Sequence, residues 1–227
     1  MTTPELVPRF NRTERAVHWT YAVCFLVLLG TGLTMYLPVL SQFFPSRFIL
    51  RQLHLAAAFF LFTAPTLIAL LGDRRSLAAD VKVVDEWDED DRAWLNDTVN
   101  GFPTTPGRFN AGQKLNAAFV AGSALVFLGT GIVMAINIYT RFLPAWLVSN
   151  ASLIHDLLTW LALFAWLGHV FLAGVYPPTR ESLRGMLTGF VRRDWALKHH
   201  PRWLESVTGL GPPILSKEPA RYNQPVE

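Results

Sequence analysis

The sequence predicts an all-α membrane protein, a four-transmembrane-helix bundle with a cytoplasmic C-terminal amphipathic helix. Of its 227 residues, 51% are hydrophobic and only 16% are charged, which leaves too little polar sequence to cover several apolar segments in water. Four apolar stretches each reach the roughly 20 residues that a helix needs to cross a bilayer. Four of the six histidines lie within these stretches, where polar groups are costly.

The four spans are predicted at about residues 16–40, 50–72, 113–139 and 150–176. The first three spans contain charge-free windows. The window of the fourth span, 156–179, contains a single charged residue, Asp156. The first window starts too far into the chain and runs too long to resemble a cleavable export signal, so we expect no signal peptide. Residues 1–15 are expected to form an N-terminal arm, 16–178 the transmembrane domain and 179–227 a tail.

The distribution of basic residues predicts that both termini are cytoplasmic. Of the 20 Lys and Arg residues, only Arg47, Arg51 and Arg141 lie in the two short loops after the first and third spans. Cytoplasmic segments carry the excess of Lys and Arg in membrane proteins. The net charge of +3 therefore reports topology and contact with anionic lipid headgroups, and it gives no reason to expect a nucleic-acid partner.

The polar segments outside the spans have patterns of their own. The middle loop, 73–114, has an acidic half at 85–91, typical of a solvated helix or turn, and a Gly/Pro-rich half at 101–107. Lys114 is expected to anchor the third span at the headgroups. After Pro178, Thr179 is predicted to cap an amphipathic helix on the inner surface. Its apolar face is expected to comprise Leu183, Met186, Leu187 and Phe190. His199 and His200 are expected to be surface or docking residues.

The intramembrane histidines are candidate ligands of two haem irons. With both termini inside, His54 and His155 fall near the outer ends of spans two and four, while His18 and His169 lie nearer the inner side. His155 and His169 are 14 residues apart, which is about 21 Å along a helix and about 40° around it. The depths match in one way, His54 with His155 for the outer haem iron and His18 with His169 for the inner one. The depths of the inner pair do not match fully. His18 lies two residues past Ala16, where the first span begins, whereas His169 lies eight residues before Pro177, which follows the fourth span.

A weak internal repeat links the two halves of the chain and is consistent with repeated helix pairs. The segment LLGTGLTM in span one resembles FLGTGIVM in span three, offset by 99 residues, and His54 and His155 are offset by 101. Gly30 and Gly129, with the neighbouring Gly32 and Gly131, are expected to make room for a haem. Close helix packing by small residues explains these glycines equally well.

Two arginines are candidate partners of haem propionates, Arg15 on the inner side and Arg51 on the outer side. Topology or snorkelling to the headgroups also explains both, and is favoured for Arg15. Cys24 is the only cysteine, so the chain itself has no disulfide, no cysteine-bound iron-sulfur cluster and no covalent haem motif. Without any cofactor, the histidines would make interhelical hydrogen bonds, and the chain would be a haem-free membrane anchor or a small transporter.

The segment RFNAGQKLN at 108–116, the four histidines and the segment GFVRRDWALKHHP at 189–201 together resemble the cytochrome b (gamma) subunit of membrane-bound respiratory formate dehydrogenase. The resemblance covers nearly the whole chain. It implies a subunit with two haem b groups in the cytoplasmic (inner) membrane of a bacterium or archaeon. Its implied partners are an iron-sulfur (beta) subunit and a molybdenum or tungsten catalytic (alpha) subunit, so the chain would not act on the donor substrate by itself.

The resemblance also implies site residues. The same four histidines would hold the haems, and a quinone, menaquinone or ubiquinone, would bind at Asn110, Gly112, Gln113 and His169, with Asn110 donating to a quinone carbonyl. Taken alone, Asn, Gly and Gln before a span also suit a helix start. The acidic segment 80–97 matches no familiar motif and leaves the partner enzyme open. The alternatives are a cytochrome b of a hydrogenase or of a thiosulfate or polysulfide reductase, and a higher oligomer of the complex is left open.

Overall fold

The computed structural model describes residues 5–44, 46–100 and 105–209, with the side chains of 97–100 left out. Part of the predicted N-terminal arm, residues 101–104 of the Gly/Pro-rich half and residues 210–227 of the predicted tail lie outside the described residues. Four long helices dominate the rest, and each is long and apolar enough to cross a membrane. They are α1 (Arg12–Tyr36), α3 (Arg47–Leu71), α6 (Ala111–Thr140) and α7 (Ala145–Val170), the last continued by the π-helical turn η1 (Phe171–Val175). The predicted class, an all-α membrane protein with four spans, is confirmed.

The same capping motif starts the first helix of each half. In α1 the Asn11 side chain accepts a bond from the Glu14 backbone N–H at 2.9 Å, and the Glu14 carboxylate accepts one from the Asn11 N–H. Asn110 and Gln113 make the equivalent pair of bonds at the start of α6. Each motif satisfies two N–H groups that the first turn leaves without partners. As a result α1 begins at Arg12, ahead of the charge-free window.

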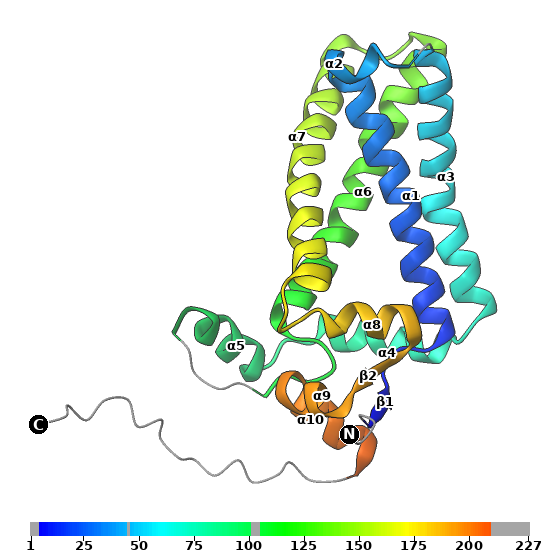
Figure 1. The fold of residues 1–227 in the computed structure, drawn as a ribbon. Coiled ribbons are helices and arrows are strands. Elements are labelled where there is room, and N and C mark those ends of the chain that lie inside the picture. Colours follow the sequence, from blue (N-terminus) through cyan, green and yellow to red (C-terminus); the bar gives the residue numbers. More distant parts are fainter. Residues whose placement is uncertain (1–4, 45, 101–104, 210–227) are drawn as a thin grey trace, which may run out of the picture.

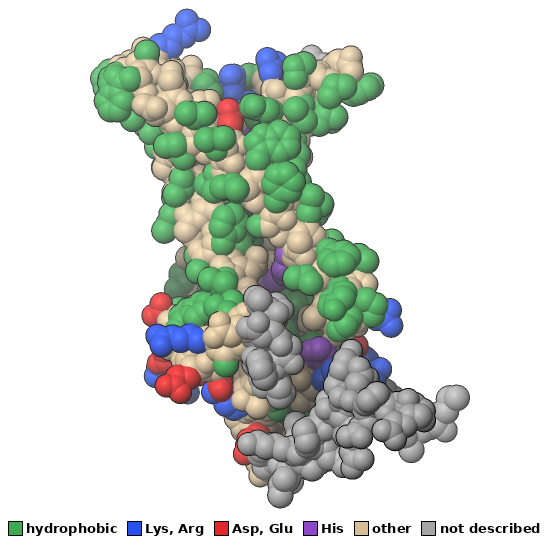
Figure 2. Space-filling view, turned by 90° about the vertical axis from the view of Figure 1, so that its left-hand side faces the viewer, with side chains coloured by type: hydrophobic (Ala, Val, Ile, Leu, Met, Phe, Trp, Pro, Cys, Tyr) green, Lys and Arg blue, Asp and Glu red, His purple; other side chains and the backbone are tan. Residues whose placement is uncertain are grey.

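The long helices form two antiparallel pairs. Helix α1 packs along α3 and α6 packs along α7, whereas α1 and α7 approach each other over a short stretch only (Figure 1). Few side chains in the four helices are buried, and most of the buried ones are small or aliphatic, such as Leu29, Ala57, Ala124 and Ala162. The apolar surface of the bundle separates charged side chains that gather toward the two ends (Figure 2). This pattern is expected of a protein whose middle lies in lipid.

The two ends of the bundle differ in construction. At one end, the loop end, the connections are short: residues 37–46, which include α2 (Pro38–Ser41), and residues 141–144. At the other, the terminal end, smaller elements from the N-terminal arm, the middle loop and the C-terminal tail form a cap (Figure 1). These elements are α4 (Arg74–Asp85), α5 (Glu89–Asn100), α8 (Glu181–Thr188), α9 (Arg193–His199) and α10 (Pro201–Thr208), with strands β1 (Leu6–Pro8) and β2 (Phe190–Arg192).

The cap ties the N-terminal arm to the tail. Strands β1 and β2 pair antiparallel with Val7 opposite Val191, and both valines enter a small core with Ala196, Trp203 and Leu204. Pairing between residues so far apart in sequence leaves no trace in helical periodicity. The predicted amphipathic helix therefore differs from the structure: α8 ends at Thr188, Gly189 adopts φ 90°, and Phe190 belongs to β2.

Three further predictions about the polar segments are wrong. Thr179 does not cap α8, because the capping position is Arg180 and the Thr179 hydroxyl donates to the Leu172 carbonyl. His200 is buried in the cap, where Arg9 and the Gly107 carbonyl contact its ring. His199, in contrast, keeps part of its surface exposed, which does not contradict the prediction, and it stacks on a tryptophan ring.

The third concerns Lys114, which lies beside the acidic half of the middle loop. Lys114 is no headgroup anchor, because its ammonium is buried in an ion pair of 2.6 Å with Asp91, which is also buried. Pairing of the two charges offsets the cost of removing both from water. Asp88 and Asp90, in turn, form ion pairs with Arg202 of α10. The acidic run is thus partly a structural element of the cap.

Candidate cofactor site

The structure brings the four intramembrane histidines together as two pairs. At the loop end His54 of α3 faces His155 of α7, with ring centroids 6.3 Å apart and ring planes at 54°. At the terminal end His18 of α1 faces His169 of α7, also at 6.3 Å, with planes at 43°. We call these the loop-end pair and the terminal-end pair. They are the pairs expected from the matching of depths.

The centroid separation fits one metal ion between two imidazoles. Metal–nitrogen bonds of about 2.0–2.1 Å, as at zinc, and about 1.2 Å from each nitrogen to its ring centre give roughly 6.4 Å between centroids. A direct hydrogen bond of about 3 Å between ring nitrogens would bring the centroids to roughly 5.3 Å. Both pairs are therefore spaced for an ion between the rings rather than for direct contact.

The donor set fits a porphyrin iron. Within the described ranges 5–44, 46–100 and 105–209, no group of three or more His, Cys, Asp or Glu side chains is placed to hold a metal ion. Two imidazoles alone cannot complete the coordination of a bare transition metal, but each pair could hold the iron of a haem, whose ring would provide the remaining ligands. The residues therefore fit two haem groups.

The glycines of the repeat lie beside the loop-end pair. A Cβ atom added at Gly30 or Gly129 would meet nothing within 4 Å, so both positions border open space. A Cβ at Gly32 would lie 3.6 Å from Cε1 of His54, and one at Gly131 would lie 3.7 Å from Cε1 of His155. Each half thus presents one glycine to open space and one to the histidine ring of its partner helix.

Two threonines that were not among the predicted site residues contact the loop-end pair. The Thr31 hydroxyl lies 2.8 Å from Nδ1 of His54, and the Thr130 hydroxyl lies 2.8 Å from Nδ1 of His155. Both are the central residue of the repeated GTG segment. The repeat could therefore have predicted these contacts, since the two threonines and the two histidines recur at nearly the same offset along the chain.

The terminal-end pair has different surroundings. Nδ1 of His18 is buried without a hydrogen-bond partner, and the ring meets Trp19 edge-to-face at 5.1 Å. The mismatch in depth disappears, because α1 begins six residues before His18 and η1 ends six residues after His169. Helix α1 extends past its charge-free window at this end, whereas η1 stops before Pro177, and together these two helix ends equalise the two depths.

The structure separates the two candidate arginines. Arg15 donates through Nε to the Met186 carbonyl at 3.0 Å and through Nη2 to the Leu187 carbonyl, so it caps the last turn of α8. Arg51 lies over the Phe48 ring, and its buried Nε has no hydrogen-bond partner. Arg51 therefore has a donor free for a carboxylate, whereas two donors of Arg15 are already bonded to backbone carbonyls of α8.

The predicted quinone residues form the first turn of α6. Asn110 and Gln113 are engaged in the capping motif, and Gly112 is required by close packing, since a Cβ there would lie 2.9 Å from the Trp94 ring. The structure brings these three residues together. No contact between them and the His169 ring is seen in the part of the chain that the structure describes.

Ionisable groups gather where α1 enters the cap. Glu14, one turn before His18, shares Arg108 with Asp80, at 2.9 Å and 2.6 Å, and Glu14 and Arg108 line a cavity of about 210 Å³. Burial raises the pKa of Asp80 to about 6, against the attraction of Arg108. Burial and the neighbouring Arg108 lower the pKa of Arg9 to about 9.

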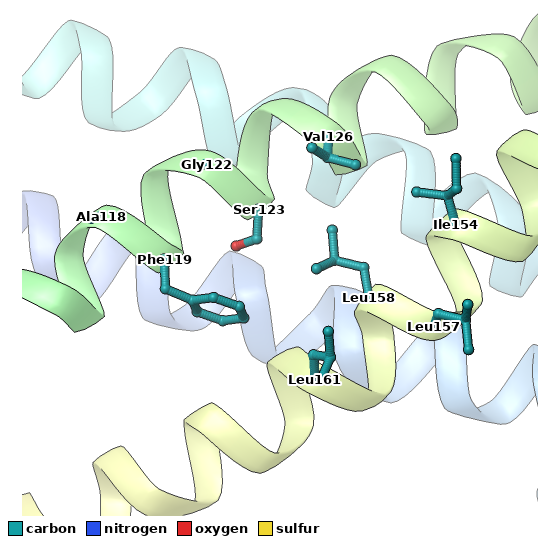
Figure 3. A pocket seen from close by; sticks show the side chains of 9 residues that line it. All are labelled: Ala118, Phe119, Gly122, Ser123, Val126, Ile154, Leu157, Leu158 and Leu161. Carbon is teal, nitrogen blue, oxygen red and sulfur yellow. The ribbon is translucent and has the colours of Figure 1, made fainter.

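A larger apolar groove lies between α6 and α7 and contains none of the predicted site residues. Its volume is about 400 Å³, and it is lined by Ala118, Phe119, Gly122, Ser123, Val126, Ile154, Leu157, Leu158 and Leu161 (Figure 3). The one polar side chain, Ser123, donates to the carbonyl of Val120 in its own helix. The groove has no titratable group and offers no chemistry of its own.

Comparison with known proteins agrees with this geometry. The family model of the prokaryotic cytochrome b561 matches residues 9–189. The nitrate-inducible formate dehydrogenase cytochrome b556(Fdn) subunit of Escherichia coli is 26% identical over 216 residues, covering 91% of this chain and 94% of the relative. The formate dehydrogenase cytochrome b556 subunit of Haemophilus influenzae is 24% identical over 227 residues, covering 95% and 90%. The chain belongs to the prokaryotic cytochrome b561 family.

Proposed function

We propose that the chain is the di-haem subunit that anchors a periplasmic formate dehydrogenase and conducts electrons from its iron-sulfur subunit to quinone at the cytoplasmic side. The observation that carries the proposal is the equal spacing of the two histidine pairs, 6.3 Å in each. The formate dehydrogenase assignment rests on the names of relatives that match over nearly the full length.

The histidines bind and space the cofactors. Each haem, when bound, supplies one-electron redox chemistry that no side chain provides. Helix α7 contributes one ligand to each pair, and the 14 residues between His155 and His169 set the two levels about 21 Å apart along its axis. One rigid helix thus fixes the spacing on which electron transfer depends.

The loop end is assigned to the periplasmic side and the terminal end to the cytoplasmic side. The support is the positive-inside distribution of Lys and Arg. Iron-sulfur and catalytic partners would then dock at the loop end, where Phe43 and Phe142 are about three-quarters exposed. Quinone would be reduced beside the terminal-end pair, with Asn110 donating a hydrogen bond and the cytoplasm supplying protons.

The order of electron flow can be tested in the purified complex with formate as donor. His18→Ala should block quinone reduction but leave the remaining b-type haem reducible by formate, because that haem lies on the donor side. His155→Ala should leave the terminal-end haem oxidised after formate is added, because the electron path from the donor is broken, yet that haem should still be reducible by dithionite. The opposite pattern would reverse the direction, and a complex that oxidises hydrogen or thiosulfate but not formate would reassign the partner enzyme.

A further inference from the structure

The GTG segments of the two halves act on the loop-end histidines in the same way. Thr31 lies on α1 and contacts His54 of the paired α3, while Thr130 lies on α6 and contacts His155 of the paired α7. Both contacts join an Oγ1 to an Nδ1 at 2.8 Å. The two halves therefore hold their histidines with equivalent residues across equivalent helix pairs.

The chemistry of each hydroxyl assigns the proton on the ring. Oγ1 of Thr31 lies 2.7 Å from the Val27 carbonyl, and Oγ1 of Thr130 lies 2.7 Å from the Val126 carbonyl. A carbonyl only accepts, so it takes the single hydroxyl proton and leaves the hydroxyl oxygen to accept from Nδ1–H. The proton on Nδ1 leaves the lone pair on Nε2 of each ring.

On the basis of the proposed function, we propose that Thr31 and Thr130 are positioning residues that fix the tautomer and angle of the loop-end haem ligands and lower that haem's reduction potential. A hydrogen bond from the far nitrogen of a metal-bound imidazole makes the ligand more basic, which favours the more positive, ferric iron. His18 lacks such a bond, since its Nδ1 has no partner. The tuning therefore acts on one haem of the two.

The test is a redox titration of the purified, haem-loaded complex with variants at both threonines. Thr31→Val and Thr130→Val keep the side-chain shape and remove the hydroxyl. Each should raise the midpoint potential of the loop-end haem and change its ferric electron paramagnetic resonance signal. The double variant should shift the potential and the signal further than either single variant. The terminal-end haem should stay unchanged. Loss of haem retention by roughly ten- to a hundredfold, confined to the loop-end haem, would equally support the proposal.

Two controls separate the hydroxyl from packing. Thr31→Ser and Thr130→Ser retain the hydroxyl and should behave like the unsubstituted protein. Thr34→Val removes a buried hydroxyl one turn along α1 that, among the described residues, bonds only the Gly30 carbonyl, and it should leave both potentials unchanged. The proposal is overturned if the valine variants keep the normal potential and signal, or if serine fails to restore them. Absence of any haem from the unsubstituted complex would instead overturn the proposed function.

Discussion

The loop-end and terminal-end histidine pairs have equal ring separations but unequal surroundings. At the loop end a threonine bonds each ring and a glycine abuts it, all within the four long helices. At the terminal end His18 is buried with no partner for Nδ1, and the neighbouring Trp19 and Arg15 bind carbonyls of the cap helix α8. The spacing comes from the helices, while the local environment of each pair comes from different parts of the chain.

The difference follows from how the halves are related. His54 and His155 each lie on the second helix of a pair, so the repeated GTG segment serves both. His18 and His169 lie on the first helix of one pair and the second helix of the other, positions that the repeat does not relate. The loop-end pair can therefore be symmetric, whereas the terminal-end pair depends on contacts that only the cap supplies.

The largest effect is expected from removing a ligand. On the proposed function, His155→Ala should reduce the haem content from two per chain to one, and His169→Ala should do the same at the other end, because each change removes one of the two histidines that would hold a haem. Pyridine haemochrome assays and reduced-minus-oxidised spectra measure the content and show which band is lost. Loss of both haems from either variant, with the fold intact by circular dichroism, would contradict the independence of the two pairs.

A smaller effect is expected at Asn110, in the proposed quinone site at the start of α6. Asn110→Ser keeps a capping side chain but removes the amide donor, so quinone reduction should fall about tenfold or more with both haems retained. Asn11→Ser alters the matching cap of α1 and serves as the control. An equal loss of activity in both variants would indicate that Asn110 acts through the helix start alone.

A charge change at Arg51 should act on the loop end only. A cation near a haem favours its reduced state, so Arg51→Gln should lower the loop-end midpoint potential. For a partly buried charge, the ratio of reduced to oxidised haem at a fixed potential should fall by about fivefold. Arg15→Gln should leave that potential unchanged, since Arg15 binds α8. Potentiometric titration measures both, and an unshifted potential in Arg51→Gln would remove Arg51 from the propionate assignment.

The smallest effect is expected from acid on the cap. Burial and the adjacent Arg9 hold the pKa of His200 well below 6.5, so the unfolded segment binds the proton first as the pH falls below about 6.5. The cap is then fully stable above that pH and loosens below it, although the raised pKa of Asp80 acts in the opposite direction from about pH 6 downward.

Hydrogen exchange of residues 193–208 between pH 7.5 and 6 measures this loosening. His200→Gln, which cannot take up the proton, should show exchange protection that depends less on pH. The loop-end haem should keep its spectrum throughout, because its ligands do not touch the cap. A change confined to the loop-end haem would contradict the contrast between the two ends.

Much of the fold and the pairing of the histidines was predictable, because both follow from local apolar runs and helix geometry. His54, His155, His18 and His169 could be matched by depth alone. The threonines were not predicted as site residues, because the repeat gave a reason to expect room for a haem at its glycines but none to expect a contact at the threonine between them. The cap could not be predicted: the pairing of β1 with β2 and the burial of Lys114 and His200 depend on contacts between distant segments.

Haem stoichiometry of the purified chain, with the coordination state of each iron, tests the central claim most directly. Pyridine haemochrome analysis should give two haem b per polypeptide, and near-infrared magnetic circular dichroism should report two bis-histidine irons. A single haem, no haem, or an iron held by any other side chain would contradict the account.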